Sequence, residues 1–319
     1  MSQQHDSSGS RQGLRFRIAY RSDVGKLRTE NQDFGLVTTP AEWDPADGVL
    51  MLVADGMGGH RGGATASRLA ARTILTTFLE RKDQDTAGAL VEAIEAANAK
   101  VFAESGAHHE LRGMGTTASA MVVRGERAFV AHVGDSRIYR LRDAELTQLT
   151  EDHSLVATMV REGLLTDAEA AVHPRRNVLQ RSLGVGPEIE VDRLEQLDIH
   201  AGDVYLLCSD GLHGFVPLEQ VQKALELPVE EAAARCIQLA HEAGAPDNVT
   251  VVICRADAAT GGERSVLPER TLELPPPTGE RGGSVSAFRW IWIGLLVGAA
   301  GAVAWLWSDL RAALSRPGL

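Results

Sequence analysis

The sequence predicts an α+β fold in which helices cover antiparallel sheets, with a transmembrane helix added near the C-terminus. Short apolar runs rich in β-branched residues alternate with longer segments that carry apolar residues at helical spacing. Several short runs are separated only by hairpin-sized turns, which favours antiparallel pairing. With 319 residues, 44% of them hydrophobic, the chain can bury a sizeable core.

Short apolar segments supply the predicted strands, because they have the length and the β-branched content of strands. No internal repeat of fixed period connects them. The segments are VLMLVAD (49–55), TTASAMVVRG (116–125), RAFVAHVGD (127–135), SRIYRLRD (136–143), DVYLLCSDG (203–211) and NVTVVICRA (248–256).

Longer segments with helical periodicity supply the predicted helices. In 64–82 and in 87–102 the apolar residues recur every three or four positions, as on one face of a helix. The segment 228–244 opens with Pro and closes with Gly, which are typical helix start and stop signals. Two shorter helical patterns cover 154–165 and 166–172.

Composition divides the chain into five segments. Residues 1–12 are polar, are expected to be disordered, and lack the charged-then-apolar pattern of a secretory signal. The folded domain is expected over 13–256. Residues 257–287 are rich in Pro, Gly and charge, which predicts a flexible linker. A transmembrane helix, 288–307, and a short tail, 308–319, follow.

The predicted span carries no charge from Trp290 to Trp307, which is about 27 Å of helix at roughly 1.5 Å per residue. A fully buried core helix is the alternative. Four of the five tryptophans lie at the two ends of this run, where an interfacial aromatic belt would place them. We therefore expect one crossing of the cytoplasmic membrane, and the missing signal peptide predicts that the folded domain faces the cytoplasm.

Charge and cysteine content limit the possible partners and compartments. The formal net charge is −11, from 32 Lys and Arg against 43 Asp and Glu, so nucleic acid is not an expected partner. Cys208, Cys236 and Cys254 form no C-x-x-C pair, and two of them lie in apolar runs. They are expected to be buried free thiols in a reducing compartment.

Four aspartates stand at the ends of predicted strands, each with Gly or Asn beside it. Each alone has a conformational explanation, since Asp and Gly punctuate turns. Together, carboxylates gathered at strand ends would repel one another unless a cation lay between them. A set of oxygen ligands without Cys or paired His suits Mg²⁺ or Mn²⁺ rather than Zn²⁺. The four are Asp55, Asp135, Asp210 and Asp247.

An arginine and a fifth aspartate, Arg28 and Asp33, lie five residues apart in a segment of turn residues. Two cations close together would lower the pKa of a bridging water and present a hydroxide for in-line attack. A guanidinium grips phosphate oxygens in a bidentate way, so an arginine beside two metals would make a phosphoryl group the target. The alternative is that Arg28 is a surface residue on a loop.

The motifs around these residues resemble those of the metal-dependent Ser/Thr protein phosphatase family, the PPM or protein phosphatase 2C type, and specifically its compact bacterial branch. Eight motifs occur in family order over roughly residues 15–255, which makes the resemblance specific. They are SDVGKLRTENQD, VADGMGGHRGGATAS, GMGTTAS, AHVGDSRIYRL, LTEDHS, VLQRSLG, CSDGL and DNVTVV.

The resemblance implies a central antiparallel β-sandwich flanked by helices, in αββα layers, with a pair of Mn²⁺ or Mg²⁺ ions in a cleft at one end. Asp55 would bridge the two ions, and the carbonyl of Gly56 would complete one of them. Asp210 and Asp247 would bind the other ion. Bacterial members often show a third ion, which would fall to Asp135 and Asp210.

The resemblance also assigns roles around the metals. Asp33 would act mainly through metal-bound water, and Arg28 would hold the substrate phosphate. His60 resembles the proposed general acid, and its intrinsic pKa near 6.5 suits protonation of a serine or threonine leaving oxygen. The alternative for His60 is a loop histidine near a helix start. Gln32 stands where many members carry Glu, so the second ion is expected to bind more weakly than in those members.

The region between the EDHS and RSLG motifs resembles the flap subdomain beside the active site. Arg175, Arg176 and Arg181 stand out there in an acidic protein and could attract a phosphorylated substrate. A solvated face explains them equally well.

The leading functional hypothesis is a membrane-tethered phosphatase that acts on phosphoserine and phosphothreonine of cytoplasmic proteins, with a cognate Ser/Thr kinase as a further partner. The rival is a non-catalytic member that binds phosphoproteins or scaffolds a membrane complex. The presence of Asp55, Asp210 and Asp247 favours catalysis. A small phosphorylated regulator, such as an anti-sigma antagonist, is another possible target, and no residue decides this.

Overall fold

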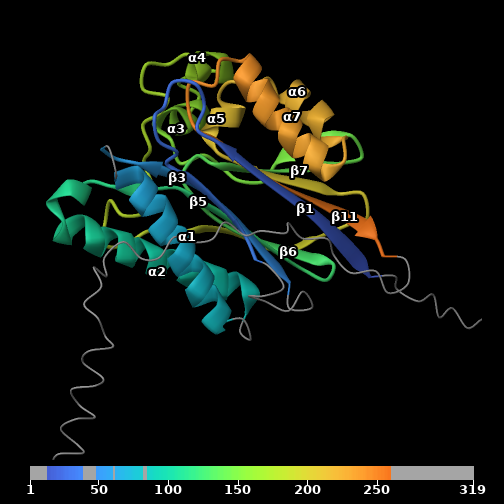
Figure 1. Ribbon diagram of the computed structural model, residues 1–319, viewed down its shortest axis with the longest axis horizontal. Helices are drawn as coiled ribbons and strands as arrows, with labels where there is room; N and C mark the ends of the chain where they lie inside the picture. Colours follow the sequence, from blue (N-terminus) through green and yellow to red (C-terminus); the bar gives the residue numbers. More distant parts are fainter. Residues whose placement is uncertain (1–12, 39–47, 60–61, 82–84, 260–319) are drawn as a thin grey trace, which may run out of the picture. The chain divides into compact units, whose positions relative to one another are not determined.

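Two antiparallel sheets pack face to face at the centre of the domain, in a computed structural model that describes residues 13–38, 48–59, 62–81 and 85–259 (Figure 1). Sheet A runs in the order β1 (Leu14–Asp23), β11 (Val249–Ala258), β10 (Val204–Cys208), β7 (Arg137–Arg142) and β8 (Glu145–Gln148). Sheet B runs in the order β2 (Asp33–Val37), β3 (Val49–Met57), β5 (Ala118–Arg124), β6 (Arg127–Val133) and β9 (Asp192–Asp198), and the short β4 (Gly115–Thr116) pairs with β3.

The space between the sheets is filled by apolar side chains from both of them. Met51 and Val53 of β3 meet Tyr205 and Leu207 of β10 in one buried cluster. The other faces of these strands are buried as well, under helices. Burial on both faces explains why β3 and β10 are continuous apolar runs rather than alternating ones.

Helices cover the outer face of each sheet, which gives the αββα layers. On sheet B lie α1 (Gly62–Arg81) and α2 (Thr86–Ala107), whose side chains Ile74, Phe78, Leu90 and Ile94 are in one cluster with those of the sheet. On sheet A lie α6 (Leu218–Leu225) and α7 (Val229–Glu242). The remaining helices are η2 (His109–Leu111), α3 (Leu155–Arg161), α4 (Asp167–Ala171) and α5 (Asp210–His213).

The predicted strands and helices are confirmed, and the layered sandwich agrees with the family resemblance. The prediction omitted the helices η2, α5 and α6 and the strands β1, β2, β8 and β9. These strands lack a long apolar run: β9, for example, reads DRLEQLD and lies at the edge of sheet B, where polar residues are common. Cys208, Cys236 and Cys254 are free and buried as predicted, and burial raises the pKa of each thiol.

Part of the predicted organisation concerns residues outside the described ranges. The predicted disordered N-terminus, nearly all of the linker, the transmembrane helix 288–307 and the tail lie there. Of the helices that the structure describes, none is long and apolar enough to span a bilayer. The described residues all belong to one compact unit, Met1–Leu274.

Candidate active site

Strand ends bring the five predicted aspartates together at one end of the sandwich. Asp33 begins β2, and Asp55 lies near the end of β3. Asp210 follows β10 and Asp247 precedes β11, and these two strands are antiparallel neighbours, so their connecting ends meet. Each of the other four carboxylates, Asp135 included, acts electrostatically on Asp55. Residues on or next to strands of both sheets therefore form the site.

Asp33 and Asp55 are direct cross-strand partners in the register of β2 and β3. Side chains at directly opposed positions project from the same face of a sheet, with Cβ atoms about 5 Å apart. Asp33 is buried, and Ser209 donates a hydrogen bond to its Oδ2 at 2.6 Å. Two carboxylates placed opposite one another destabilise the sheet unless protons or a cation compensate their charge.

The backbone of Asp55 is fixed by Thr116 of β4 and by Thr117, which follows it. The amide of Asp55 donates to Thr117 Oγ1 at 2.9 Å, and its carbonyl accepts from Thr116 Oγ1 and from the Thr117 amide, both at 2.9 Å. Thr117 Oγ1 also lies 2.7 Å from Ser136 Oγ, next to Asp135. The backbone position of Asp55 is thus linked to the turn that carries Asp135.

Gly56 can occupy its position only because it lacks a side chain. A Cβ at this residue would lie 2.1 Å from the carbonyl oxygen of Gly63 and 2.6 Å from that of Gln32. Gln32 supports this close approach, since its carbonyl oxygen accepts from the Gly56 amide at 3.1 Å and from Ser67 Oγ at 2.6 Å. The Gln32 side chain packs against Gly63 at the start of α1.

Arg28 lies at the rim of the carboxylate site. Its Nη2 donates to Asp247 Oδ2 at 2.6 Å, and about half of its side chain is exposed, 51%. The hydrogen bond to Asp247 raises the pKa of Arg28, and the charges of Asp247, Asp210 and Asp55 add to that effect. Sequence alone left open a surface arginine on a loop, and the structure places Arg28 at the carboxylates.

The loop before Asp33 is anchored by Asn248, a residue that the sequence prediction did not single out. Asn248 Nδ2 donates to the carbonyls of Val24 and Glu30, at 2.9 and 3.0 Å, and Oδ1 accepts from the Gln32 amide at 2.8 Å. Its position in the DNVTVV motif, directly before a buried strand, was the available signal, because a buried polar side chain there needs backbone partners.

Burial and mutual repulsion disfavour ionisation of the clustered carboxylates. Burial, as the largest cause, raises the pKa of Asp33 to about 7, of Asp135 to about 8 and of Asp210 to about 6, and it raises the pKa of Asp55 well above its usual value. Repulsion from a neighbouring aspartate adds to each shift. A bound cation would stabilise the ionised form of these carboxylates, because its positive charge offsets their mutual repulsion.

The donor set fits a hard divalent cation. Asp210 Oδ1 is buried and has no hydrogen-bond partner, which is costly for a carboxylate unless a cation takes that place. Within the described ranges, however, no three Asp, Glu, His or Cys side chains stand preassembled around a single point. Two of the carboxylates are held by other partners, Asp247 by Arg28 and Asp33 by Ser209. Each of these two contacts engages one oxygen of the carboxylate, Oδ2.

The remaining predicted residues are placed as follows. His60 lies outside the described residues. Arg181 forms an ion pair with Asp192 at 2.7 Å, a contact that neither alternative from the sequence, attraction of substrate or a solvated face, included. The charge of Arg176 opposes the rise in the pKa of Asp210 that burial causes, which places Arg176 near the site.

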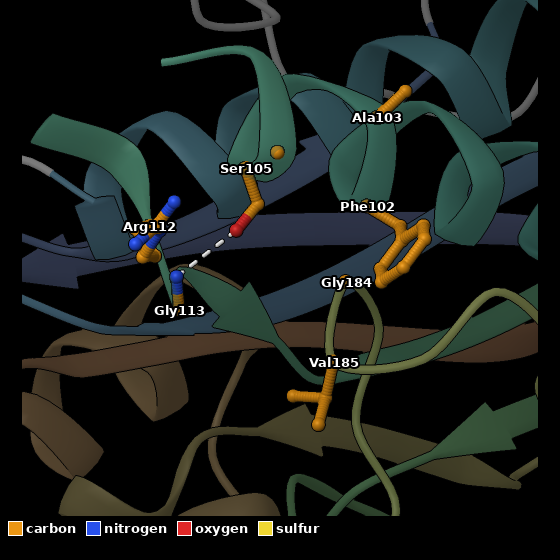
Figure 2. A pocket seen from close by; sticks show the side chains of 8 residues that line it. Phe102, Ala103, Ser105, Arg112, Gly113, Gly184 and Val185 are labelled. Carbon is orange, nitrogen blue, oxygen red and sulfur yellow. Dashed lines mark hydrogen bonds between the residues drawn. The ribbon is translucent and has the colours of Figure 1, made fainter. Parts of the chain in front are cut away.

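A separate cavity of about 420 Å³ lies between the end of α2 and the loop 112–113 (Figure 2). Phe102 and Val185 form its apolar walls, and Arg112 is its one charged lining residue. The amide of Gly113 donates to Ser105 Oγ at 3.0 Å across it. None of the predicted site residues lines this cavity, so it is not part of the carboxylate site.

Comparison with known proteins identifies the family. The profile described as Protein phosphatase 2C matches residues 28–249. The serine/threonine protein phosphatase PstP of Mycobacterium tuberculosis is 42% identical over 241 residues, which cover 75% of this chain and 45% of that protein. The serine/threonine phosphatase stp of Listeria monocytogenes is 37% identical over 249 residues, which cover 76% of this chain and 97% of that protein. The chain thus spans less than half of the mycobacterial relative and almost all of the Listeria one.

Solved structures agree with this assignment. The catalytic domain of PstP, crystallised in complex with two manganese ions, superposes with a TM-score of 0.65 at 39% identity and covers 76% of this chain and 99% of that one. The family predicted from the eight motifs is confirmed.

Proposed function

The chain belongs to the protein phosphatase 2C family, and on that basis we propose that it hydrolyses phosphoserine and phosphothreonine in proteins with the help of two divalent cations, Mn²⁺ or Mg²⁺. The observation that carries the proposal is the placement of Arg28 against Asp247 at the rim of a buried carboxylate cluster. This arrangement supports the proposal, because a guanidinium can bind phosphate and clustered carboxylates can hold metal ions.

The residues that would hold the ions are Asp55, the carbonyl of Gly56, Asp210 and Asp247, with Asp33 close by. When bound, the ions supply a strongly activated water and neutralise charge on the phosphoryl group. A third ion would involve Asp135 and Asp210. The neutral Gln32 leaves the second ion with one carboxylate fewer than a glutamate would give it.

The protein's own groups position the substrate. Arg28 offers a planar donor fork at the rim, half-exposed, where an incoming phosphate can replace its contact with Asp247. Ser209 holds Asp33 in place by its hydrogen bond, and Asn248 holds the loop that carries Arg28. His60 would donate a proton to the departing serine or threonine oxygen.

The activity is tested with full-length protein in detergent and a phosphothreonine peptide. Release of phosphate should require Mn²⁺ or Mg²⁺ and stop when a chelator is added. Peptide binding without phosphate release at any metal concentration would instead support a non-catalytic, phosphoprotein-binding member of the family.

The uncharged run Trp290–Trp307 supports a further part of the proposal, a single-pass anchor in the cytoplasmic membrane with the catalytic domain in the cytoplasm. Substrates would then be cytoplasmic phosphoproteins near the membrane, phosphorylated by a cognate Ser/Thr kinase. The protein should sediment with membranes and resist extraction by salt. Release by salt alone would contradict a membrane-spanning anchor.

A further inference from the structure

The turn that carries Asp135 is held by histidines from distant parts of the chain. Residues 134–136 connect β6 of sheet B to β7 of sheet A. The His153 amide donates to the Gly134 carbonyl at 2.7 Å, and the Gly134 amide donates to His153 Nδ1 at 3.1 Å. His213 Nε2 lies 2.9 Å from the carbonyl oxygen of Asp135 itself. Both backbone groups of Gly134 are thus bound by one residue, His153.

The backbone conformation of this turn is restricted at Gly134. Its φ is +114°, and a Cβ would lie 2.5 Å from Thr117 Cγ2, so both its conformation and its packing require glycine. His132 Nε2 lies 3.1 Å from the same Gly134 carbonyl, and the rings of His132 and His153 have centroids 4.8 Å apart. A shift of Gly134 would therefore move the adjacent Asp135.

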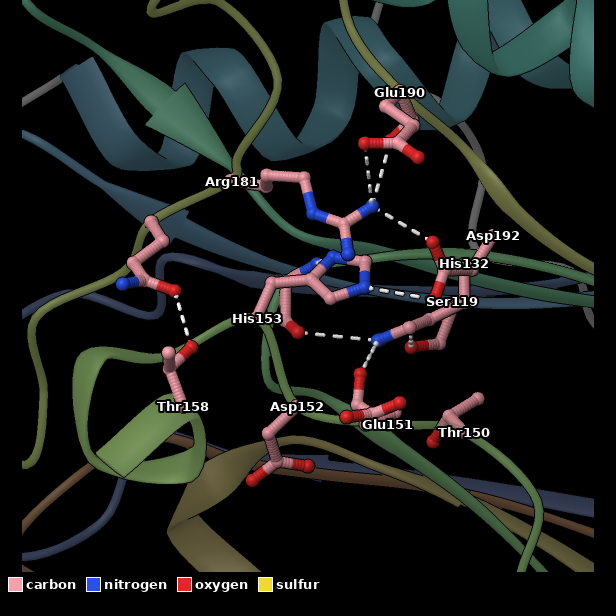
Figure 3. Close-up of polar contacts among 12 residues, drawn as sticks. Ser119, His132, Thr150, Glu151, Asp152, His153, Thr158, Arg181, Glu190 and Asp192 are labelled. Atoms are coloured by element: carbon pink, nitrogen blue, oxygen red, sulfur yellow. Dashed lines mark hydrogen bonds and ion pairs between the residues drawn. The ribbon is translucent and has the colours of Figure 1, made fainter. Parts of the chain in front are cut away.

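The hydrogen bond from the Gly134 amide to His153 Nδ1 depends on which ring nitrogen of His153 carries the proton. Burial lowers the pKa of His153, so its ring is neutral near pH 7. Because Nδ1 accepts from Gly134, the hydrogen of the neutral ring must be on Nε2. Nε2 lies 3.1 Å from Asp192 Oδ2, although its N–H is not well aligned with that oxygen (Figure 3). The negative charge of Asp192 favours this tautomer.

Asp192 also connects His153 to the flap, which we define as residues 154–180. Arg181, directly after the flap, donates to Asp192 Oδ1 at 2.7 Å (Figure 3). The Gln180 amide donates to the His153 carbonyl at 2.8 Å. Ser154, directly after His153, caps α3 at the start of the flap. Both ends of the flap therefore meet at His153, and Asp192 contacts both His153 and Arg181.

We propose that His153 and Asp192 are positioning residues for Asp135, and that through Gly134 they set the affinity of the cation that Asp135 would hold. This inference rests on the proposed metal-dependent function. Without Asp192, the His153 proton is free to move to Nδ1, where it would oppose the Gly134 amide, donor against donor. The turn would then relax and Asp135 would lose its orientation.

Glu190 provides a matched control. It also pairs with Arg181, at 3.6 Å, but its side chain is 83% exposed, and Figure 3 shows it in contact with Arg181 and not with His153. Glu190→Ala thus removes a neighbouring negative charge and an Arg181 contact while leaving the contact between Asp192 and His153 in place.

The test is titration calorimetry of full-length protein in detergent with Mn²⁺, together with kcat and KM for a phosphopeptide. Asp135→Asn should remove one Mn²⁺-binding step. Asp192→Ala should weaken that same step by about ten-fold, as is usual for a group that orients a metal ligand, and leave the other steps unchanged. In the Asp135→Asn background, Asp192→Ala should cause no additional loss of Mn²⁺ affinity. Asp192→Asn, which keeps an acceptor oxygen, should weaken Mn²⁺ binding less than Asp192→Ala does. Glu190→Ala should bind Mn²⁺ as wild type does.

Several results would overturn the inference. They are unchanged Mn²⁺ binding in Asp192→Ala, an equal loss in Glu190→Ala, or the same loss with and without Asp135. If Asp192→Ala fails to fold, Asp192→Asn must show the selective loss instead. Wild-type protein that binds Mn²⁺ without releasing phosphate would refute the proposed function alone, because the binding steps would still report on Asp192.

Discussion

Arg28 Nη2 and Asp247 Oδ2 lie 2.6 Å apart although 219 positions separate the two residues in the chain. The contact joins the loop before β2 to the loop before β11, and Asn248 fixes the same two segments through backbone hydrogen bonds. A proposed phosphate-binding group is therefore held directly beside a proposed metal ligand. This relationship leads to a prediction for Arg28, and the carboxylate cluster beside it leads to one for Asp55.

Replacement of Arg28 should weaken substrate binding without unfolding the protein. A charge-assisted hydrogen bond contributes about 1.5–3 kcal/mol, so Arg28→Ala should lower kcat/KM by about 10- to 150-fold, mainly through KM. Arg28→Lys should recover only part of this, because an ammonium cannot form the bidentate contact. Steady-state kinetics on a phosphothreonine peptide measures both. Equal KM values in wild type and Arg28→Ala would contradict the assigned role.

Replacement of Asp55 should abolish turnover. Asp55→Asn keeps the shape of the side chain but removes the charge expected to bridge two ions, and metal ions contribute several kcal/mol to catalysis, so kcat should fall by at least about 100-fold. The loss should persist at saturating Mn²⁺. Thermal unfolding of the metal-free variant should not fall below that of wild type, since the substitution relieves repulsion from Asp33. Full activity would refute the two-metal site.

The sequence predicted which carboxylates form the site but not how they are held. Asp55, Asp210 and Asp247 were identifiable because each ends or precedes an apolar run and belongs to a recognisable motif. Asn248 was not singled out, although it organises the loop of Arg28, because its contacts are with backbone groups more than 200 positions away. A hydrogen bond to a backbone group needs no particular side chain at the partner position, so it leaves no pattern in the sequence.

The strand β9 was missed for a different reason, which is its weak hydrophobic pattern. The strand β9 carries charged residues and pairs with β6 through an irregular register, so neither a hydrophobic run nor a strict alternation marks it. For Arg181 the sequence left two alternatives open, attraction of a phosphorylated substrate and a solvated face. Its partner Asp192 lies on β9, so the ion pair could not be foreseen without that strand.

Metal binding should tighten as the pH rises from 6 to 8. Burial raises the pKa of Asp210 to about 6, of Asp33 to about 7 and of Asp135 to about 8, so protons compete with cations across this range. The stability of the metal-free protein should change in the opposite direction and fall as the pH rises. A raised folded-state pKa stabilises the fold at low pH, and that stability is lost as the pH rises through the folded-state pKa values.

Thermal unfolding with and without Mn²⁺ at pH 6 and pH 8 measures both effects. The increase in Tm caused by Mn²⁺ should be larger at pH 8, and the Tm of the metal-free protein should be higher at pH 6. Asp135→Asn should reduce the pH dependence of the metal-free protein. A Tm increase that is the same at both pH values would show that these carboxyls do not exchange protons for metal.

Far from the site, an ion pair on sheet A should be important for stability but not for catalysis. Asp203 has a side chain that is only 1% exposed, and it accepts two hydrogen bonds from Arg142, at 2.7 and 2.6 Å, and one from the His200 amide at 2.8 Å. Arg142→Met would leave this buried carboxylate without its cation, which should cost about 3 kcal/mol in the free energy of unfolding.

Urea unfolding at two pH values tests this pair. The pKa of Asp203 is lowered, because its hydrogen bonds to Arg142 and to the His200 backbone outweigh the effect of burial. Its contribution is therefore present above the unfolded-state pKa and is lost as the pH falls through the folded-state value, so the difference between wild type and Arg142→Met should shrink at pH 3. The exposed pair of Arg127 and Asp198 is the control, and Asp198→Asn should cause no measurable loss. A similar loss in both variants would mean that burial of Asp203 does not determine the strength of its ion pair.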